Sequence, residues 1–330
     1  MSSRKKVLFI DFWSESNYLH ASGSGIGSSL FKLAALADAS FENYEIHLLT
    51  SPSKKELLEN ASGMDFIFTE ISSKNLNSFH KIINLGIADD EFPEEIKILD
   101  NYHPFTQADR KKYKSSAHLS FWRAFVAEAL NYPLPNRKSQ IKLCTDSEEI
   151  IWADKILPKN YKWIALSYQC ISPLKDYKEW DKVINDLLNS DSSIRFILLG
   201  EKHESFEESE RIINMMGKTS IQKIKAIISQ VDLVLGVDGL ISNVAMALDK
   251  PAIILFTMIS PEHVIDDLKS DHFKALITRD CPYQFCYENL TNYRSSACQY
   301  LEESKTNKIP KCLKFTPESI VKEVKKFLAD

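Results

Sequence analysis

One stretch of the chain decides its fold. Residues 217–261 read GKTSIQKIKAIISQVDLVLGVDGLISNVAMALDKPAIILFTMISP. Ser220 is placed to cap a helix that has an apolar stripe, and residues 232–237 are apolar on both faces, as in an inside strand of a parallel sheet. A second helix and a second buried strand follow. Asp238 and Gly239 should therefore lie at the carboxyl end of a parallel strand, where open α/β sheets bind ligands.

The rest of the chain repeats this alternation of apolar strands and helices. In the N-terminal half, the pattern predicts strands at residues 7–12, 44–49, 66–68 and 96–99, and helices at 28–36, 54–58 and 116–130. In the C-terminal half, it predicts strands at 163–168 and 195–199, and helices at 178–188, 205–216 and 317–329. Strands separated by helices pair in parallel. We expect two Rossmann-like domains, over residues 1–157 and 158–330.

The composition limits the classes of function. Of the 330 residues, 44% are hydrophobic and 26% are charged, as in an ordinary soluble protein. The net charge of -4 gives no reason to expect nucleic-acid binding. The N-terminus has no secretory signal, and no apolar run is long enough to span a bilayer. We therefore expect a cytoplasmic protein that meets any membrane-associated substrate by peripheral contact with the inner membrane surface.

The opening stretch also resembles a known family. Gly217-Lys218-Thr219-Ser220, the strand end VDGL at residues 237–240, the small-residue helix at 245–248, Lys250-Pro251 and the loop 259–261 are similar to the donor-binding half of glycosyltransferase family 9, the ADP-heptose:lipopolysaccharide heptosyltransferases and their relatives. Residues 118–130, followed by Pro133, resemble the segment that precedes the linker in that family. The resemblance implies an α/β protein of the GT-B fold, in which two Rossmann-like domains with parallel sheets face a central cleft.

The resemblance also implies roles for particular residues of the C-terminal half. Lys175, in the segment SPLKDY at 172–177, matches the lysine that neutralises the leaving diphosphate, and the amides after Gly239 would add to it. Glu204 or its near competitor Glu201 would hold the ribose. The backbone at Lys218 and Thr219 would meet the base. The Asp238 carboxylate would accept hydrogen bonds from backbone amides of the next helix turn, a structural role that is compatible with a role in ligand binding.

Two departures from the family pattern affect the expected chemistry. The family pattern is Asp-[Ser/Thr]-Gly followed by a histidine, whereas this chain has Asp238-Gly239, with Asn243 in the histidine position. The hydroxyl residue between the aspartate and the glycine is therefore missing, and Ser242 is the residue that could replace it. The N-terminal glycine loop contains Gly25, Gly27 and Ser28, and Ser28 stands where the family has the aspartate proposed as the base. A neutral serine is not a base at pH 7. The alternative candidates for the base are Asp11, His20, Asp100 and Asp109.

Four of the six cysteines lie near the C-terminus, within residues 281–312: Cys281, Cys286, Cys298 and Cys312. Disulfides are rare in the cytoplasm, and four thiolates can hold zinc or iron in a structural site. The spacing also resembles the cysteine-held iron finger of heptosyltransferases that modify autotransporters. We expect structural zinc or iron there and, by the resemblance, no catalytic divalent metal.

The combined expectation is an inverting glycosyltransferase that moves a sugar, heptose in the first instance, from a nucleotide-diphosphate donor. ADP-heptose is the first donor to consider, and the acceptor would be a hydroxyl of a glycan, glycolipid or protein. The sequence is also compatible with a homo-oligomer. The alternative is a catalytically silent GT-B protein that binds a partner or a nucleotide, which the lost loop aspartate favours. A nucleotide-sugar epimerase, which needs no acceptor, is a third interpretation.

Overall fold

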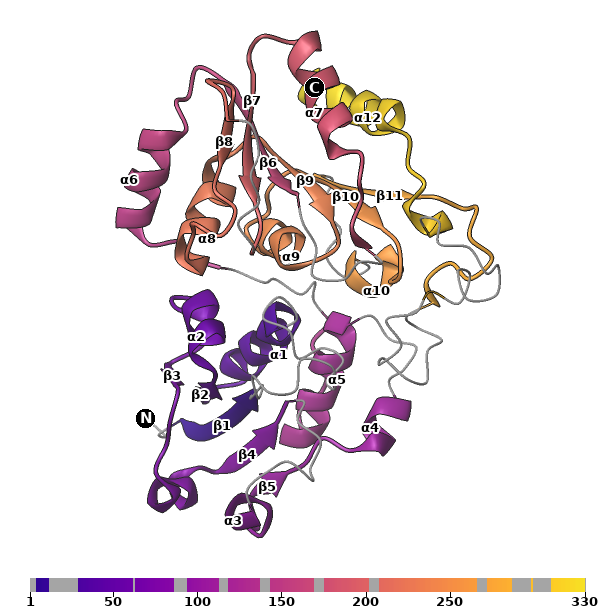
Figure 1. Cartoon of the computed structure of the whole chain (residues 1–330). Helices are drawn as coiled ribbons and strands as arrows, with labels where there is room; N and C mark the ends of the chain where they lie inside the picture. Colours follow the sequence, from indigo (N-terminus) through magenta and orange to yellow (C-terminus); the bar gives the residue numbers. More distant parts are fainter. Residues whose placement is uncertain are drawn as a thin grey trace. The chain divides into compact units, whose positions relative to one another are not determined.

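Each of the two units into which the chain divides contains one parallel sheet (Figure 1). The first unit comprises Met1–Cys144 with Glu262–Leu268, and the second comprises Thr145–Pro261 with Lys269–Asp330. The structure is a computed structural model that describes residues 4–11, 29–61, 63–85, 94–112, 118–136, 143–168, 175–201, 208–265, 272–286, 298 and 310–329. All pairings between its named strands are parallel, which confirms the predicted α/β class.

The sheet of the first unit has the strand order β3-β2-β1-β4-β5. Its strands are β1 (Lys5–Asp11), β2 (Tyr44–Thr50), β3 (Phe66–Phe68), β4 (Lys81–Asn84) and β5 (Tyr102–His103). The chain winds outward from β1 to β3, then returns to the other side of β1 for β4 and β5. Since all five strands are parallel, their carboxyl ends share one edge of the sheet, where ligands of such folds bind.

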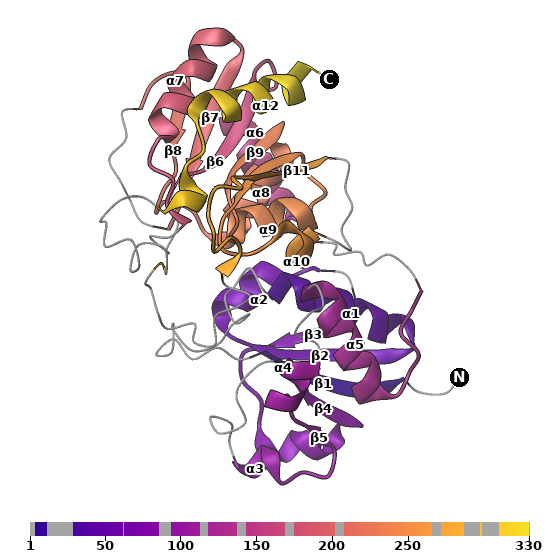
Figure 2. The ribbon, with the colours of Figure 1, turned by 90° about the vertical axis from the view of Figure 1, so that its right-hand side faces the viewer.

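Helices cover this sheet unequally. The helices are α1 (Ser29–Phe41), α2 (Pro52–Leu58), α3 (Glu94–Lys97), α4 (Gln107–Lys112) and α5 (His118–Leu130). The two longest, α1 and α5, pack against each other (Figures 1 and 2). A separate core cluster joins Leu8, Ile10 and Leu49 of the strands to Leu76, from the 3₁₀ helix Ser73–Ser78, and to Ile96 of α3. The unit therefore buries its strands in two apolar layers.

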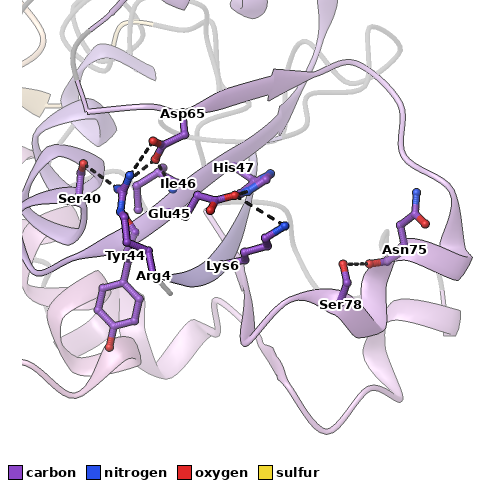
Figure 3. Close-up of polar contacts among 10 residues, drawn as sticks. All are labelled: Arg4, Lys6, Ser40, Tyr44, Glu45, Ile46, His47, Asp65, Asn75 and Ser78. Atoms are coloured by element: carbon purple, nitrogen blue, oxygen red, sulfur yellow. Dashed lines mark hydrogen bonds and ion pairs between the residues drawn. The ribbon is translucent and has the colours of Figure 1, made fainter. Parts of the chain in front are cut away.

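Polar side chains fix the amino-terminal edge of the first sheet (Figure 3). Arg4, just before β1, makes two hydrogen bonds to the Asp65 carboxylate, at 2.8 and 3.1 Å, and also donates to the carbonyl oxygen of Tyr44. Oδ2 of Asp65 accepts the backbone N–H of Ile46 at 2.7 Å. These contacts tie the starts of β1, β2 and β3 together at the edge opposite the one that binds ligands in such sheets.

The sheet of the second unit has the strand order β11-β10-β9-β6-β7-β8. Its strands are β6 (Lys162–Ser167), β7 (Ile194–Leu199), β8 (Ile212–Asn214), β9 (Leu233–Val237), β10 (Ala252–Phe256) and β11 (Phe273–Ile277). Its helices are α6 (Ser147–Ile156), α7 (Trp180–Ser190), α8 (Ile221–Gln230), α9 (Leu240–Ala247) and α12 (Pro317–Ala329). The short helix α10 (Pro261–Ile265) follows β10, and from Glu262 onward it belongs to the first unit. Every residue of β9 and β10 is buried, as predicted for strands that are apolar on both faces.

Both faces of this sheet carry helices. On one face, α7 and α12 contact each other and share a core cluster with alternate strand residues, among them Ile164, Leu166 and Leu235. Helix α8 contacts both α6 and α9. Helix α8 begins as the sequence predicts, since Ser220 Oγ accepts the backbone N–H of Lys223. The sheet of the second unit is therefore covered by helices on both of its faces.

Several short elements differ from the sequence-based prediction. Residues 96–99 were expected to form a strand, but the structure has α3 at Glu94–Lys97, and the strands β4 and β5 were not foreseen. Residues 205–216 were expected to be helical, but Ile212–Asn214 form the edge strand β8. A short apolar run fits either a strand or a helix, so pairing with β7 decided the conformation of β8.

In the part of the chain that the structure describes, none of the helices has the length and apolarity needed to cross a bilayer.

Candidate functional site

The winding of the second sheet reverses between β6 and β9. The chain runs from β6 outward to β7 and β8, then returns to β9 on the other side of β6 and continues to β10 and β11. The loops that follow the two strands at such a reversal diverge, which leaves room for a ligand at the carboxyl edge. In this chain those loops carry Lys175, after β6, and Asp238, directly after β9.

Lys175 and Asp238 contact each other at this edge. Nζ of Lys175 donates to Oδ2 of Asp238 at 2.6 Å and to the Asp238 carbonyl oxygen at 3.3 Å. Their side chains are only 16% and 9% exposed, so each charge relies on polar partners rather than water. An ammonium group held beside the start of α9 suits an anionic ligand such as a phosphate.

The loop that carries Lys175 is held in place by a buried aromatic residue. Tyr177, two positions later, is 4% exposed and packs edge-on against Trp180 with ring centroids 4.9 Å apart. Its hydroxyl donates to the carbonyl oxygen of Phe315 at 3.1 Å. Tyr177 is thus an anchor in the core, and it sets the position of Lys175 without facing a ligand itself.

The spacing of the two loops depends on a glycine that the sequence analysis did not single out. Gly236 lies within β9, and a Cβ atom placed on it would come 2.5 Å from Cβ of Ser167, the last residue of β6. Real Cβ atoms do not approach so closely, so only glycine lets β9 lie at this distance from β6. An isolated glycine inside a strand pattern is the signal that could have revealed it.

The start of α9 uses the hydroxyl group of Ser242. Ser242 Oγ accepts the backbone N–H of Gly239 at 2.9 Å and donates to the Gly239 carbonyl oxygen at 2.8 Å. Gly239 itself is extended, with φ of 175°, and a Cβ atom there would come no closer than 4.0 Å to the nearest atom, the carbonyl oxygen of Val237. The Ser242 hydroxyl is therefore engaged in closing the first turn of α9. It is not a free group that could take the place of the hydroxyl found in the family pattern.

Asn243 adds a buried polar atom at the start of α9. Its side chain is 8% exposed, and its Oδ1 atom has no hydrogen-bond partner among the residues that the structure describes. Its backbone N–H donates to the carbonyl oxygen of Gly239 at 3.0 Å, which places it one helical turn from the Asp238–Gly239 loop. A buried acceptor of this kind is normally satisfied, so a ligand that donates a hydrogen bond would stabilise it.

The remaining predicted donor residues follow β7 and β8 at the same edge. Glu201 is exposed and lies two residues after β7. Lys218 donates to the Asn214 carbonyl oxygen at 2.8 Å, and Thr219 directly precedes the cap of α8. Glu204 lies outside the described residues. The second unit thus gathers the described candidates on loops that leave one edge of its sheet.

In the first unit, Asp11 is the centre of a buried ionic cluster. It ends β1 and is 2% exposed, and its Oδ1 atom lies 2.5 Å from Nζ of Lys32 and 3.0 Å from Nζ of Lys54. Ser29 donates to its Oδ2 at 2.7 Å. Burial acts to raise the pKa of Asp11, but the two lysine charges and the hydrogen bonds outweigh it and lower the pKa to about 2. Such a carboxylate is a weak base.

The other candidate bases are Asp109, Asp100 and His20. Asp109 accepts hydrogen bonds from the backbone N–H of Thr106 at 2.7 Å and from its hydroxyl at 2.6 Å, so it caps α4. Asp100 is exposed and precedes β5, at the amino-terminal edge of the sheet. His20 lies outside the described residues, as do Gly25, Gly27 and Ser28. The structure therefore does not bring Asp11, Asp100 and Asp109 together.

The cysteines of the C-terminal segment lie near one another without forming a ligand sphere. Cys281 and Cys312 are buried, Cys286 and Cys298 are partly buried, and all four are free thiols. Burial, and then the proximity of the other three, raises the pKa of Cys312 to about 12. Among the described residues, no group of three or more histidine, cysteine or acidic side chains is arranged to hold an ion. The metal site stays a prediction.

Comparison with known proteins identifies the family. The model of glycosyltransferase family 9 (heptosyltransferase) matches residues 102–282, more than half of the chain. The chain belongs to this family. It is therefore a glycosyltransferase that resembles heptosyltransferases. A search of curated proteins finds no match.

Solved structures of similar fold cover nearly the whole chain. A glycosyl transferase family 9 protein from Veillonella parvula aligns with TM-score 0.69 and 11% identity, over 100% of this chain and 99% of that one. The E. coli ADP-heptose LPS heptosyltransferase II aligns with TM-score 0.67 and 13% identity, over 98% of both chains. The iron-containing dodecameric glycosyltransferase TibC from enterotoxigenic E. coli aligns with TM-score 0.63 and 10% identity, over 100% of this chain and 77% of that one. These likenesses confirm the GT-B fold class.

Proposed function

We propose that the protein is an inverting transferase that moves a heptose from ADP-heptose to a hydroxyl group of a glycan, glycolipid or protein. The observation that carries the proposal is the contact between Lys175 and Asp238, at the reversal of the second sheet and the start of α9. Two structural neighbours support the choice of donor: E. coli heptosyltransferase WaaC is described with ADP-2-deoxy-2-fluoro heptose, and TibC with ADP-D-β-D-heptose.

The second unit would act on the donor through charge. When the diphosphate binds, the ammonium group of Lys175 would exchange Asp238 for a phosphate oxygen and stabilise the negative charge that develops on the leaving group. Amide N–H groups at the start of α9 would contribute in the same sense. Glu201 or Glu204 would hold the ribose, and the backbone at Lys218 and Thr219 would meet the base. This set of groups does not call for a catalytic divalent metal.

Activation of the acceptor would fall to a group other than Asp11. The pKa of about 2 makes Asp11 the counter-ion of two lysines, and Asp109 is engaged in capping α4. A general base needs a pKa nearer to the working pH. We propose His20 or Asp100 as the base, because these are the two sequence-based candidates that remain, although His20 lies outside the described residues.

The four C-terminal cysteines would hold a structural zinc or iron ion. Four thiols whose charges influence one another form a donor set that suits either metal, and TibC is described as iron-containing. Binding would release the thiol protons, because the thiolate is the ligand. We further propose that the protein works in the cytoplasm, where nucleotide sugars are made and where the five described free thiols stay reduced. There it would act as a homo-oligomer and contact the membrane surface peripherally.

Nucleotide binding tests the proposal. A thermal-shift and calorimetry panel with ADP, UDP, GDP, TDP and CMP should show selective binding of ADP, and Lys175→Ala should weaken it by roughly 10- to 100-fold, as for the loss of a charge-assisted hydrogen bond. Lys182→Ala is the matched control, because Lys182 lies on the exposed side of α7 and pairs with Glu179. No response to any nucleotide would refute the proposal and favour a catalytically silent protein that binds a partner.

A further inference from the structure

Gln284, in the turn between Cys281 and Cys286, contacts the carboxyl edge of the second sheet. Its backbone N–H donates to the carbonyl oxygen of Cys281 at 3.2 Å. Its side-chain Nε2 group donates to the carbonyl oxygen of Thr257 at 3.5 Å. Since the amide nitrogen faces this carbonyl, the side-chain oxygen must point the other way.

Thr257 lies next to the Asp238–Gly239 loop. It directly follows β10, whose residue Leu255 pairs with Val237 of β9, so Thr257 is level with Gly239 in the register. The backbone N–H of Asp238 donates to the carbonyl oxygen of Leu255 at 3.2 Å, which joins the two strand ends. Gln284 is therefore a neighbour of the proposed donor site, although it is far away in the sequence.

The oxygen atom of the Gln284 side chain is buried and has no hydrogen-bond partner among the described residues. Oδ1 of Asn243 has the same property. An unsatisfied buried acceptor is destabilising. Two such atoms, on side chains that follow β9 and neighbour the end of β10, favour a ligand that donates hydrogen bonds. A phosphate has no donor at neutral pH except a residual proton, whereas each hydroxyl group of a sugar can donate.

The order of the strands shows which part of the ligand would meet Gln284. Along the carboxyl edge, the loops after β8 and β7 come first, then those after β6 and β9, and then the end of β10. A nucleotide sugar has the same linear order of base and ribose, diphosphate, and sugar. With the diphosphate at Lys175 and Asp238, and the base near Thr219, the sugar falls at the end of β10.

We propose that Gln284 is a specificity-determining residue, whose side-chain oxygen accepts a hydrogen bond from a hydroxyl group of the transferred sugar, with Asn243 as the second acceptor. This proposal rests on the proposed function of the same site. A sugar that lacks the hydroxyl group would leave the oxygen unpaired, and the site would discriminate against it.

The substitution Gln284→Leu tests the contact, because leucine keeps most of the volume and removes the polar atoms. The dissociation constants of ADP and of ADP-D-β-D-heptose should be measured by calorimetry, and kcat/KM for the heptose donor in a transfer assay. We expect kcat/KM and the affinity for ADP-heptose to fall by roughly 5- to 100-fold, while the affinity for ADP alone stays within about twofold. Gln230→Leu, at the far end of α8, is the matched glutamine control.

The outcomes separate the two proposals. If Gln284→Leu leaves the affinities for both ADP-heptose and ADP unchanged, the sugar contact is wrong and the donor site stands. If the affinity for ADP falls as much as that for ADP-heptose, Gln284 supports the loop rather than the sugar, and the proposal is overturned. If the wild-type protein binds no nucleoside diphosphate, the proposed function fails and this inference fails with it.

Discussion

Replacing Asp11 by asparagine should destabilise the first unit selectively. The change keeps the shape of the side chain and removes the only negative charge that contacts both Lys32 and Lys54 among the described residues. Both ammonium groups are almost completely buried, at 3% and 0% side-chain exposure, and water cannot replace the carboxylate. The variant would therefore leave two buried cations without their counter-ion.

The magnitude follows from two independent considerations. The lowering of the Asp11 pKa from 3.8 to about 2 corresponds to roughly 2–3 kcal/mol, at about 1.4 kcal/mol for each pH unit. Breaking a buried ion pair by removal of one partner typically costs about 3–5 kcal/mol. We expect Asp11→Asn to reduce the stability of the first unit by about 2–5 kcal/mol. In the wild type, this contribution is complete above pH 3.8 and is lost as the pH falls towards 2.

Hydrogen exchange measured by mass spectrometry can assign the loss to one unit. Exchange in peptides from β1 and α1 should accelerate by roughly 30- to 4000-fold, whereas peptides from β9 and α9 should keep their rates. Asp100→Asn, which changes an exposed aspartate of the same unit, is the control and should have no effect. A loss below about 1 kcal/mol, or equal acceleration in both units, would refute the description of Asp11 as a buried counter-ion.

Three further predictions concern other parts of the chain. Gly236→Ala should cost about 1–3 kcal/mol in thermal or urea unfolding, because its Cβ atom would collide with Ser167, whereas Gly239→Ala should be nearly neutral; equal effects would contradict the packing argument. Burial lowers the pKa of Lys32 from 10.5 to about 8, so stability should rise between pH 8 and 10.5 as the folded state releases a proton that the unfolded state retains, and Lys32→Met should remove this rise. Elemental analysis of protein purified without a histidine tag should find about one zinc or iron ion per chain, lost in Cys312→Ser; a metal-free, stably folded wild type would disprove the site.

Local sequence patterns were enough to predict much of the architecture. The apolar runs at β1, β2, β6 and β9 and the intervening helices appear where the pattern placed them, because a strand buried on both faces needs apolar residues at every position. The cap at Ser220 was also predictable, since capping depends on residues only three positions apart. The short elements that the pattern did not predict, α3, β4, β5 and β8, have two to four residues each, which is too few to show a periodicity.

The α/β class, the parallel strands and the loops that carry candidate donor residues could be predicted from the sequence, because each of these depends on residues that are neighbours in the chain. Which side chains meet could not be predicted in this way, because it depends on the tertiary structure. The contact of Lys175 with Asp238, the two lysines around Asp11 and the approach of Gln284 to Thr257 each join residues more than twenty positions apart. Their proximity follows from the strand order, which is fixed by packing across the whole sheet and leaves no mark in the local pattern of the chain.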